Sequence, residues 1–144
     1  MMKMSEAVYV VGNIDPDAYA ASTVTSGWVD ASDFDQYMAI VQAGDLGSSA
    51  TLDAKIEGAT DSGGTGAADV TSLAITQLTQ AGTDSNKQVV INIDPAALSA
   101  QSFTHFRLSM TVATATSDCG GIVLAMGKRS TASVDATTVD EIVG

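Results

Sequence analysis

Apolar and polar residues alternate along much of this chain with the period of two that is typical of β-strands. In HFRLSMTVATA, residues 105–115, every second residue from Phe106 to Val112 is apolar, which predicts a strand with one buried face. ATLDAKIEG, residues 50–58, alternates in the same way and places Asp53 and Glu57 on the solvent side. Further strands are predicted within residues 6–14, 37–41, 70–80, 88–94 and 122–127.

Polar and glycine-containing stretches separate these strands and predict turns and loops. They lie at residues 44–49, 59–69 and 116–121. After the strand QVVINID, Asp94 and Pro95 have the order of a helix cap and a first helical residue, so PAALSAQ is expected to form one short helical turn. Strands do not alternate with long helical patterns, which argues against a nucleotide-binding α/β fold.

Short strands joined by such turns predict an all-β protein: an antiparallel β-sandwich, jelly-roll-like, with extended terminal arms and at most one short helical turn. Pro16 excludes a central strand at its position, so residues 1–25 are expected to form an N-terminal arm or an edge strand. Residues 26–129 are expected to form the β-sandwich core. Residues 130–144 are expected to be a polar, acidic C-terminal tail.

The composition agrees with one domain that has a real core. The chain has 144 residues, of which 45% are hydrophobic, so it has enough apolar surface to bury. Only 5% are aromatic, which leaves Val, Ile, Leu, Ala and Met to build that core. Charged residues are sparse at 16%, and small, β-branched and hydroxylated residues favour strands and turns over helices.

The charge balance disfavours two classes of partner. Acidic residues outnumber basic ones by 17 to 6, which gives a net charge of −11. Nucleic-acid binding needs clustered Lys and Arg, and here only Lys128 and Arg129 are adjacent. The same acidity disfavours an anionic membrane surface, and no apolar run approaches the ~20 residues that span a bilayer. We therefore expect no nucleic-acid or membrane partner.

The residues with chemical potential do not form a recognisable catalytic set. Cys119 is the single cysteine, so no intrachain disulfide is possible, and we interpret it as a small residue beside a Gly120–Gly121 turn. His105 is the single histidine, and it shares the outward face of its strand with Arg107, which favours a surface or interface role over a general base.

Metal, phosphate and sugar sites are equally unsupported. The acids of DASDFD, which are Asp30, Asp33 and Asp35, lack the rest of a calcium-loop pattern, so a solvated face is favoured. The same interpretation applies to Asp53, Glu57 and Asp61. SGGTG has no lysine for a phosphate cradle, and Trp28 is interpreted as a core plug or interface anchor. No catalytic, cofactor-binding or metal-binding residue is predicted, and the protein is not expected to be an enzyme.

The order of the predicted pieces resembles a family of small structural proteins of tailed phages and prophages. The matching segments run to about Arg129. They are MKMSEAVYVVGNIDPDAYAA, VDASDFDQYMAIVQAGDLGSSATLDAKIEGATDSGG, KQVVINIDPAAL, FTHFRLSMTVATA and GGIVLAMG. The longer acidic tail after Lys128 departs from the pattern.

The resemblance implies a capsid decoration, or cement, protein. Such a protein is made in the bacterial host cytoplasm, binds the outer surface of the head through the major capsid protein, and associates with itself as a trimer or another symmetric cluster. A head–tail joining or tail-terminator protein, or the base of a head fibre, is the alternative within the virion. A carbohydrate-binding β-sandwich is a third hypothesis, disfavoured because few aromatic residues are present to stack on sugars.

Overall fold

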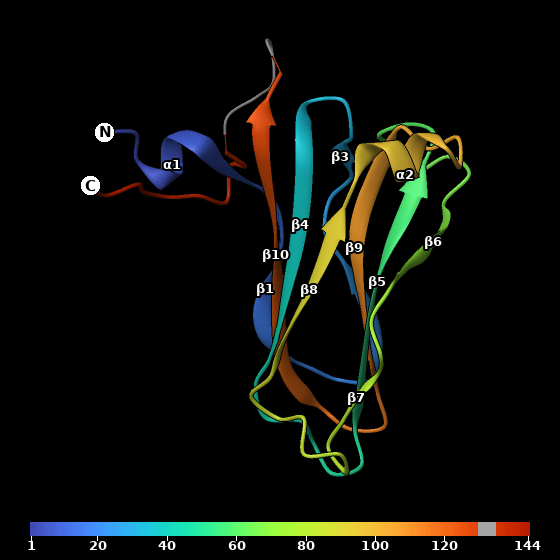
Figure 1. Cartoon of the computed structure of the whole chain (residues 1–144). Coiled ribbons are helices and arrows are strands. Elements are labelled where there is room, and N and C mark those ends of the chain that lie inside the picture. The colour runs from blue at the N-terminus through green and yellow to red at the C-terminus, as the bar shows by residue number, and fades with distance from the viewer. Residues whose placement is uncertain (130–134) are drawn as a thin grey trace.

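The computed structural model describes residues 1–129 and 135–144 and shows two β-sheets packed face to face (Figure 1). Part of the predicted tail, residues 130–134, lies outside the described residues. In chain order the elements are α1 (Met4–Ala7), β1 (Val8–Tyr19), β2 (Ser22–Thr25), β3 (Val29–Asp30), β4 (Phe34–Ala43), β5 (Thr51–Ala59), β6 (Ala68–Ala74), β7 (Leu78–Thr79), β8 (Gln88–Ile93), α2 (Pro95–Ser99), β9 (His105–Ala113) and β10 (Ser117–Lys128).

The strand order is that of a jelly roll. Sheet A has the order β1-β10-β4-β8, and sheet B has the order β2-β9-β5-β6, with β3 paired to β9 and β7 paired to β5. The chain passes repeatedly from one sheet to the other, so β1, β4 and β8 lie in sheet A while β2, β5 and β9 lie in sheet B. These paired strands are antiparallel. The prediction of an antiparallel, jelly-roll-like β-sandwich is confirmed.

Alternation along the strands builds the core. Leu52 and Ile56 of β5, and Phe106 and Leu108 of β9, have 0% exposure, as the period of two predicts. Tyr37 of β4 lies between two phenylalanine rings, with edge-on contacts to Phe34 and Phe106. Burying these side chains between the sheets is the main stabilising contribution to the fold.

The first two strands lie at the edges of the two sheets. Residues 8–19 form β1, an edge strand of sheet A that continues through Pro16 with two register shifts, and β2 is an edge strand of sheet B. Ile14 is only 4% exposed and belongs to the core. Of the two alternatives expected for residues 1–25, an arm or an edge strand, residues 8–19 and 22–25 take the second, because an edge strand can tolerate proline and bulges while still burying one face.

The predicted turn at Gly120–Gly121 is wrong, because both glycines lie inside β10. A Cβ at Gly120 would lie 2.9 Å from the Pro16 Cα, and one at Gly121 would lie 2.7 Å from Leu108 Cδ2. The glycines are required here for close packing within and between the sheets, not for a change of chain direction.

The predicted helical turn is present, and one that was not predicted accompanies it. In α2, the Asp94 carboxylate accepts a hydrogen bond of 2.8 Å from the Ala96 N–H, and Pro95 follows the cap. The additional turn, α1, precedes β1 and has no buried residue. The expectation of at most one short helical turn is therefore corrected, because the described residues contain two.

Both ends of the chain lie together and project from the sandwich on the side of sheet A (Figure 1). The Val10 N–H donates to Asp135 Oδ1 over 2.7 Å, and the Ala136 N–H donates to the Val10 carbonyl over 2.7 Å. The Lys3 ammonium donates to the Gly144 carbonyl. We call residues 1–7 and 135–144 the terminal arm. Its base is bonded to the edge strand β1.

Candidate functional site: the outer face of sheet A

The outer face of sheet A is apolar at its centre. Its strands bring together Val8 and Val10 of β1, Met38 and Ile40 of β4, Val90 of β8, and Ile122, Leu124 and Met126 of β10. Neighbours in register include Leu124 with Met38 and Ile122 with Ile40. Around this group stand the uncharged amides of Asn13, Gln36, Gln42, Gln88 and Asn92. We call this set of side chains the apolar face.

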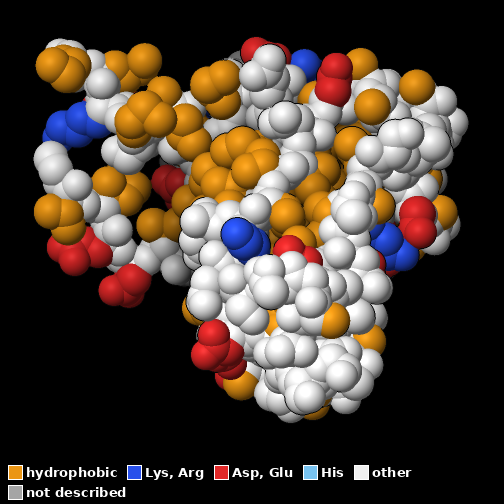
Figure 2. All heavy atoms as spheres, turned by 60° about the horizontal axis from the view of Figure 1, so that its bottom comes forward, with side chains coloured by type: hydrophobic (Ala, Val, Ile, Leu, Met, Phe, Trp, Pro, Cys, Tyr) orange, Lys and Arg blue, Asp and Glu red, His pale blue; other side chains and the backbone are white. Residues whose placement is uncertain are grey.

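The apolar face is uneven. One hollow of about 180 Å³ is lined by residues that include Val8, Met38 and Met126. A larger hollow of about 680 Å³ lies at the other end and is lined by residues that include Pro16, Gln42 and Gly120. Figure 2 shows hydrophobic side chains gathered in the middle of the view, next to the projecting arm, with most charged side chains toward the margins.

Exposed large hydrophobic side chains are confined to two places among the described residues. Val90, Ile122 and Met126 of the apolar face are 54%, 38% and 47% exposed. The others belong to the terminal arm, namely Met1, Met2, Met4, Ile142 and Val143. Contiguous exposed apolar surface of this kind is typical of a site of protein–protein contact.

The outer face of sheet B has the opposite character, because its charges pair with one another. Arg107 Nε lies 2.7 Å from Glu57 Oε2, and Lys55 Nζ lies 2.6 Å from Asp69 Oδ1. The hydrogen bond to Asp69 raises the pKa of Lys55 above its usual value. Asp53 accepts a hydrogen bond of 2.7 Å from the Gln77 amide. The sequence predicts a solvated face for Asp53 and Glu57. Both lie on the outward side of β5, but the Glu57 side chain is only 16% exposed because it is held in its ion pair.

Trp28 is packed into that polar face. The Arg107 guanidinium lies 4.5 Å from the centre of the indole ring, within the range of a cation–π contact. Gly64 approaches the ring so closely that a Cβ there would be 2.8 Å from Trp28 Nε1. The indole therefore does not present an open platform on which a sugar ring could stack.

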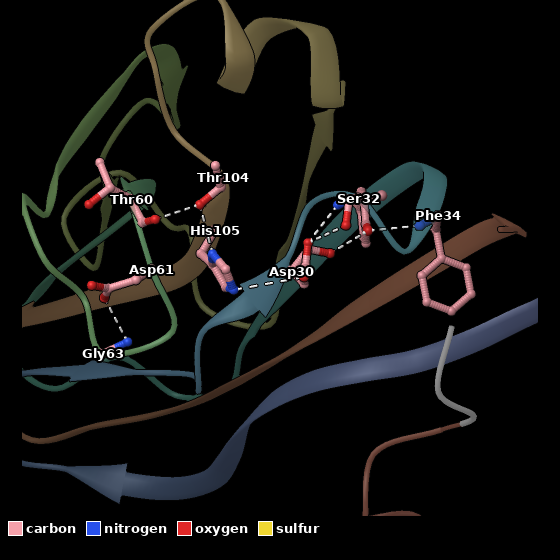
Figure 3. A network of polar contacts seen from close by, with 9 residues as sticks. Asp30, Ser32, Phe34, Thr60, Asp61, Gly63, Thr104 and His105 are labelled. Carbon is pink, nitrogen blue, oxygen red and sulfur yellow. Dashed lines mark hydrogen bonds and ion pairs between the residues drawn. The ribbon is translucent and has the colours of Figure 1, made fainter. Parts of the chain in front are cut away.

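His105 lies in a polar cluster at one end of the sandwich (Figure 3). Its Nδ1 is 2.9 Å from Thr104 Oγ1, and its Nε2 is 3.9 Å from Asp30 Oδ2. The Thr104 hydroxyl donates its proton to the Thr60 carbonyl over 2.8 Å, so it accepts from the imidazole. A nucleophilic hydroxyl would have to donate to the imidazole instead. The hydrogen bonds of this cluster connect Thr60, Thr104 and His105, and the bond between Thr104 and His105 runs in the opposite direction to that in a catalytic triad.

Asp30 is held in its charged form within the same cluster. Burial alone would raise the pKa of Asp30, but hydrogen bonds of 2.7 and 2.8 Å from the Ser32 hydroxyl and N–H, together with nearby His105, hold it below its ordinary value. Asp35 lies elsewhere, 2.8 Å from Arg129 Nε. Within residues 1–129 and 135–144, no three His, Cys, Asp or Glu side chains are grouped closely enough to hold a metal ion.

Cys119 and His105 do not come together. Cys119 is on β10 of sheet A, 4% exposed, whereas His105 is on β9 of sheet B. Burial, and secondarily the Asp118 carboxylate, raise the pKa of the Cys119 thiol to about 11. At neutral pH this side chain is a protonated thiol, which is a poor nucleophile.

The apolar face was not identified from the sequence, although a signal was present. Residues 38–41 (MAIV) and 122–126 (IVLAM) are apolar in both phases of the alternation. Such a run is typical of a strand that is buried on both faces. No helix or strand of residues 1–129 or 135–144 covers the second face, and Val90, Ile122 and Met126 are exposed there.

Comparisons with known proteins give only distant structural likenesses. No protein-family model and no curated protein matches the chain. It is similar to two structures of infectious bursal disease virus, of the Gx strain (TM-score 0.44, 15% identity) and the Gt strain (TM-score 0.42, 12% identity). Each alignment covers 83% of this chain and 32% of the other, so the chain spans about a third of their length.

A third likeness, to a mutant VP2 protein of the same virus in derived T=1 particles, has a TM-score of 0.33 and 14% identity. It covers 85% of this chain and 40% of that one. The jelly-roll assignment rests on the strand order of the chain itself. No helix in the described part of the chain is long and apolar enough to cross a membrane.

Proposed function

We propose that this chain is a structural protein of a tailed-phage virion, a decoration protein that binds the outer surface of the head and stabilises it. The observation that carries the proposal is the apolar face together with the apolar tip of the terminal arm. They concentrate all the exposed large hydrophobic side chains of the described residues on surfaces suited to protein contact. The order of sequence segments up to about Arg129, which resembles the decoration family, supplies the virion context.

The physical properties of the chain support this role. A small rigid domain that makes modest contacts gains strength when many copies bind a symmetric shell at once. A net charge of −11 disfavours contact with packaged DNA and keeps the outer surface of a particle soluble. The partners proposed are the major capsid protein and further copies of this chain, arranged as a trimer or another closed cluster.

Particle composition with stoichiometry tests the proposal. A decoration protein is expected in copy numbers comparable to those of the capsid protein, measured by quantitative gel densitometry of purified particles. A single ring of copies would instead identify the joining-protein alternative, and complete absence from the particle would overturn both virion functions.

Stabilisation of the head is tested by add-back. Heads that lack the protein are incubated with the purified chain, and the temperature at which they release DNA is measured. The control is the same heads at the same ionic strength without the chain. We expect saturable binding and a higher release temperature, whereas binding without any gain in temperature contradicts a stabilising role.

A further inference from the structure

The apolar face and the terminal arm are separate surfaces, and both expose large apolar side chains in the part of the chain that the structure describes. On the face, Val90 and Met126 expose about half of their side chains. On the arm, Met4 and Val143 are 76% and 82% exposed. Exposed aliphatic and thioether groups of this kind gain free energy when they bury one another.

The base of the arm is fixed while its tip extends outward. The bonds between Val10 and residues 135–136 hold the base at the β1 edge of sheet A. From there α1 and the last residues project away from the sandwich (Figure 1). The tip is thus presented to a neighbour on the same side of the molecule as the apolar face.

The uncharged centre of the apolar face allows a second copy of this acidic chain to be that neighbour. Two copies with a net charge of −11 repel wherever their acidic surfaces meet. The centre of the apolar face carries only aliphatic, thioether and amide groups, so the acids of an incoming arm, such as Glu6 and Asp140, meet no like charge there. Two acids near the face, Asp17 and Asp118, line the hollow at one end. Lys87, which is exposed directly before β8, offers an opposite charge at the rim.

We propose that the terminal arm of one copy binds the apolar face of the next. Its aliphatic and methionine side chains would pack on Ile122, Met126 and Val90. The contact is heterologous because it joins two different surfaces, so each copy gives one arm and receives one. Repeated around an axis, such contacts close into a ring, which is one route to a symmetric cluster. The proposal concerns the isolated protein and does not depend on a virion function.

The test uses two variants of the full chain and their mixture. Ile122→Asp places a charge on the apolar face, and the double variant Ile142→Asp, Val143→Asp places charges on the arm. Ala74→Asp, on the exposed side of β6 in sheet B, is the matched control for added negative charge. Circular dichroism melting, and the fluorescence of Trp28 on sheet B, check that each variant is folded. Sedimentation velocity over a concentration series then measures association.

We expect the wild-type chain and Ala74→Asp to associate with increasing concentration. The face variant and the arm variant should each associate at least tenfold more weakly. Their equimolar mixture should recover dimers, because one intact arm from the face variant can still bind one intact face of the arm variant. A contact between two apolar faces predicts instead that the arm variant associates normally and that mixing restores nothing.

Several results would overturn the proposal. They are a wild-type chain that stays monomeric, an arm variant that associates as the wild type does, and a mixture that remains monomeric although both variants are folded. If either charged variant fails to fold, cysteine pairing replaces it, in a Cys119→Ala background. Chains with Ile142→Cys are mixed with chains carrying Met126→Cys and oxidised. A crosslink between the two different chains supports arm-to-face contact, and its absence contradicts it.

Discussion

The outer faces of the two sheets follow the same alternation but carry different chemistry. On sheet B the outward positions hold Lys55, Glu57 and Arg107, which satisfy one another in ion pairs. On sheet A the equivalent positions hold residues such as Ile40 and Ile122, which have no polar group to satisfy. The fold needs only the inner faces to be apolar. Solubility explains the outer face of sheet B. The outer face of sheet A keeps exposed apolar side chains, which the proposed contact with a second chain would bury.

The largest effect on stability is expected when an aspartate is placed on the inward side of β10, compared with the outward side. Val123 and Ile122 are neighbours on β10, but Val123 points into the core with 0% exposure and Ile122 points outward. Val123→Asp buries a charge without a partner and should cost about 4 kcal/mol or more, enough to prevent stable folding. Ile122→Asp should change the free energy of unfolding by less than about 1 kcal/mol.

Chemical denaturation followed by circular dichroism checks this pair. Equal destabilisation of the monomer by Val123→Asp and Ile122→Asp would contradict the assignment of Ile122 to the outer face, because Ile122 would then be a core residue. Measuring at low protein concentration separates the stability of the monomer from any contribution of association.

A second prediction concerns stability at alkaline pH, and it depends on two groups on the inner side of sheet A. Burial raises the pKa of Cys119 from 9.0 to about 11, and that of Tyr37 from 10.0 to about 12. Both groups stay protonated in the folded chain at a pH where they ionise in the unfolded chain. Their contribution to stability is complete below pH 9 and is lost as the pH rises toward 11 and 12.

The free energy of unfolding should therefore fall by about 1–3 kcal/mol between pH 9 and pH 11, since one pKa unit corresponds to about 1.4 kcal/mol. Urea unfolding at several pH values measures this fall. Cys119→Ala should have a smaller fall over this range, with the remainder due largely to Tyr37. If the free energy of unfolding of Cys119→Ala falls with pH as steeply as that of the wild type, the raised pKa of the thiol is contradicted.

The sequence predicted β5 and β9 of sheet B well because the two faces of each strand differ in polarity. In β5, Leu52 and Ile56 alternate with Asp53 and Glu57, so the period of two alone identifies which side is buried. In β10 the apolar residues occupy both phases, and the alternation loses that information. The extra apolar residues on the outward side of β10 form part of the candidate site. They also remove the difference in polarity between the two sides of the strand, so the sequence pattern alone could not identify the site.

Two further differences have local causes. Gly120 and Gly121 resemble a turn in sequence, yet they lie in a strand because Pro16 and Leu108 approach them too closely for side chains. The position of residues 135–144 depends on bonds to Val10, more than a hundred residues away in the chain. No local pattern encodes such a contact.

A smaller effect is expected on the outer face of sheet B. Arg107→Ala removes the ion pair with Glu57 and the contact with the Trp28 ring. Because both side chains of the ion pair are mostly buried, the loss should be about 1–2 kcal/mol. The emission of Trp28, the single tryptophan, should change with it. Association should remain that of the wild type, since Arg107 is on the opposite side from the apolar face. Weakened association in a folded Arg107→Ala chain would contradict the separation of the two faces.

The smallest effect should come from the most exposed ion pair. Lys55 and Asp69 expose 36% and 64% of their side chains, so water screens their attraction, and exposed pairs of this kind contribute only about 0.2–1 kcal/mol. Lys55→Met keeps the aliphatic stem and removes the charge. Its destabilisation should shrink further in 1 M salt, where the screening length falls to about 3 Å. Thermal unfolding in low and high salt measures this difference. If Lys55→Met destabilises the chain as much as Arg107→Ala does, and equally in low and high salt, the Lys55 charge contributes to the fold itself and not only to the solubility of this face. The outer face of sheet B would then be as specialised as that of sheet A.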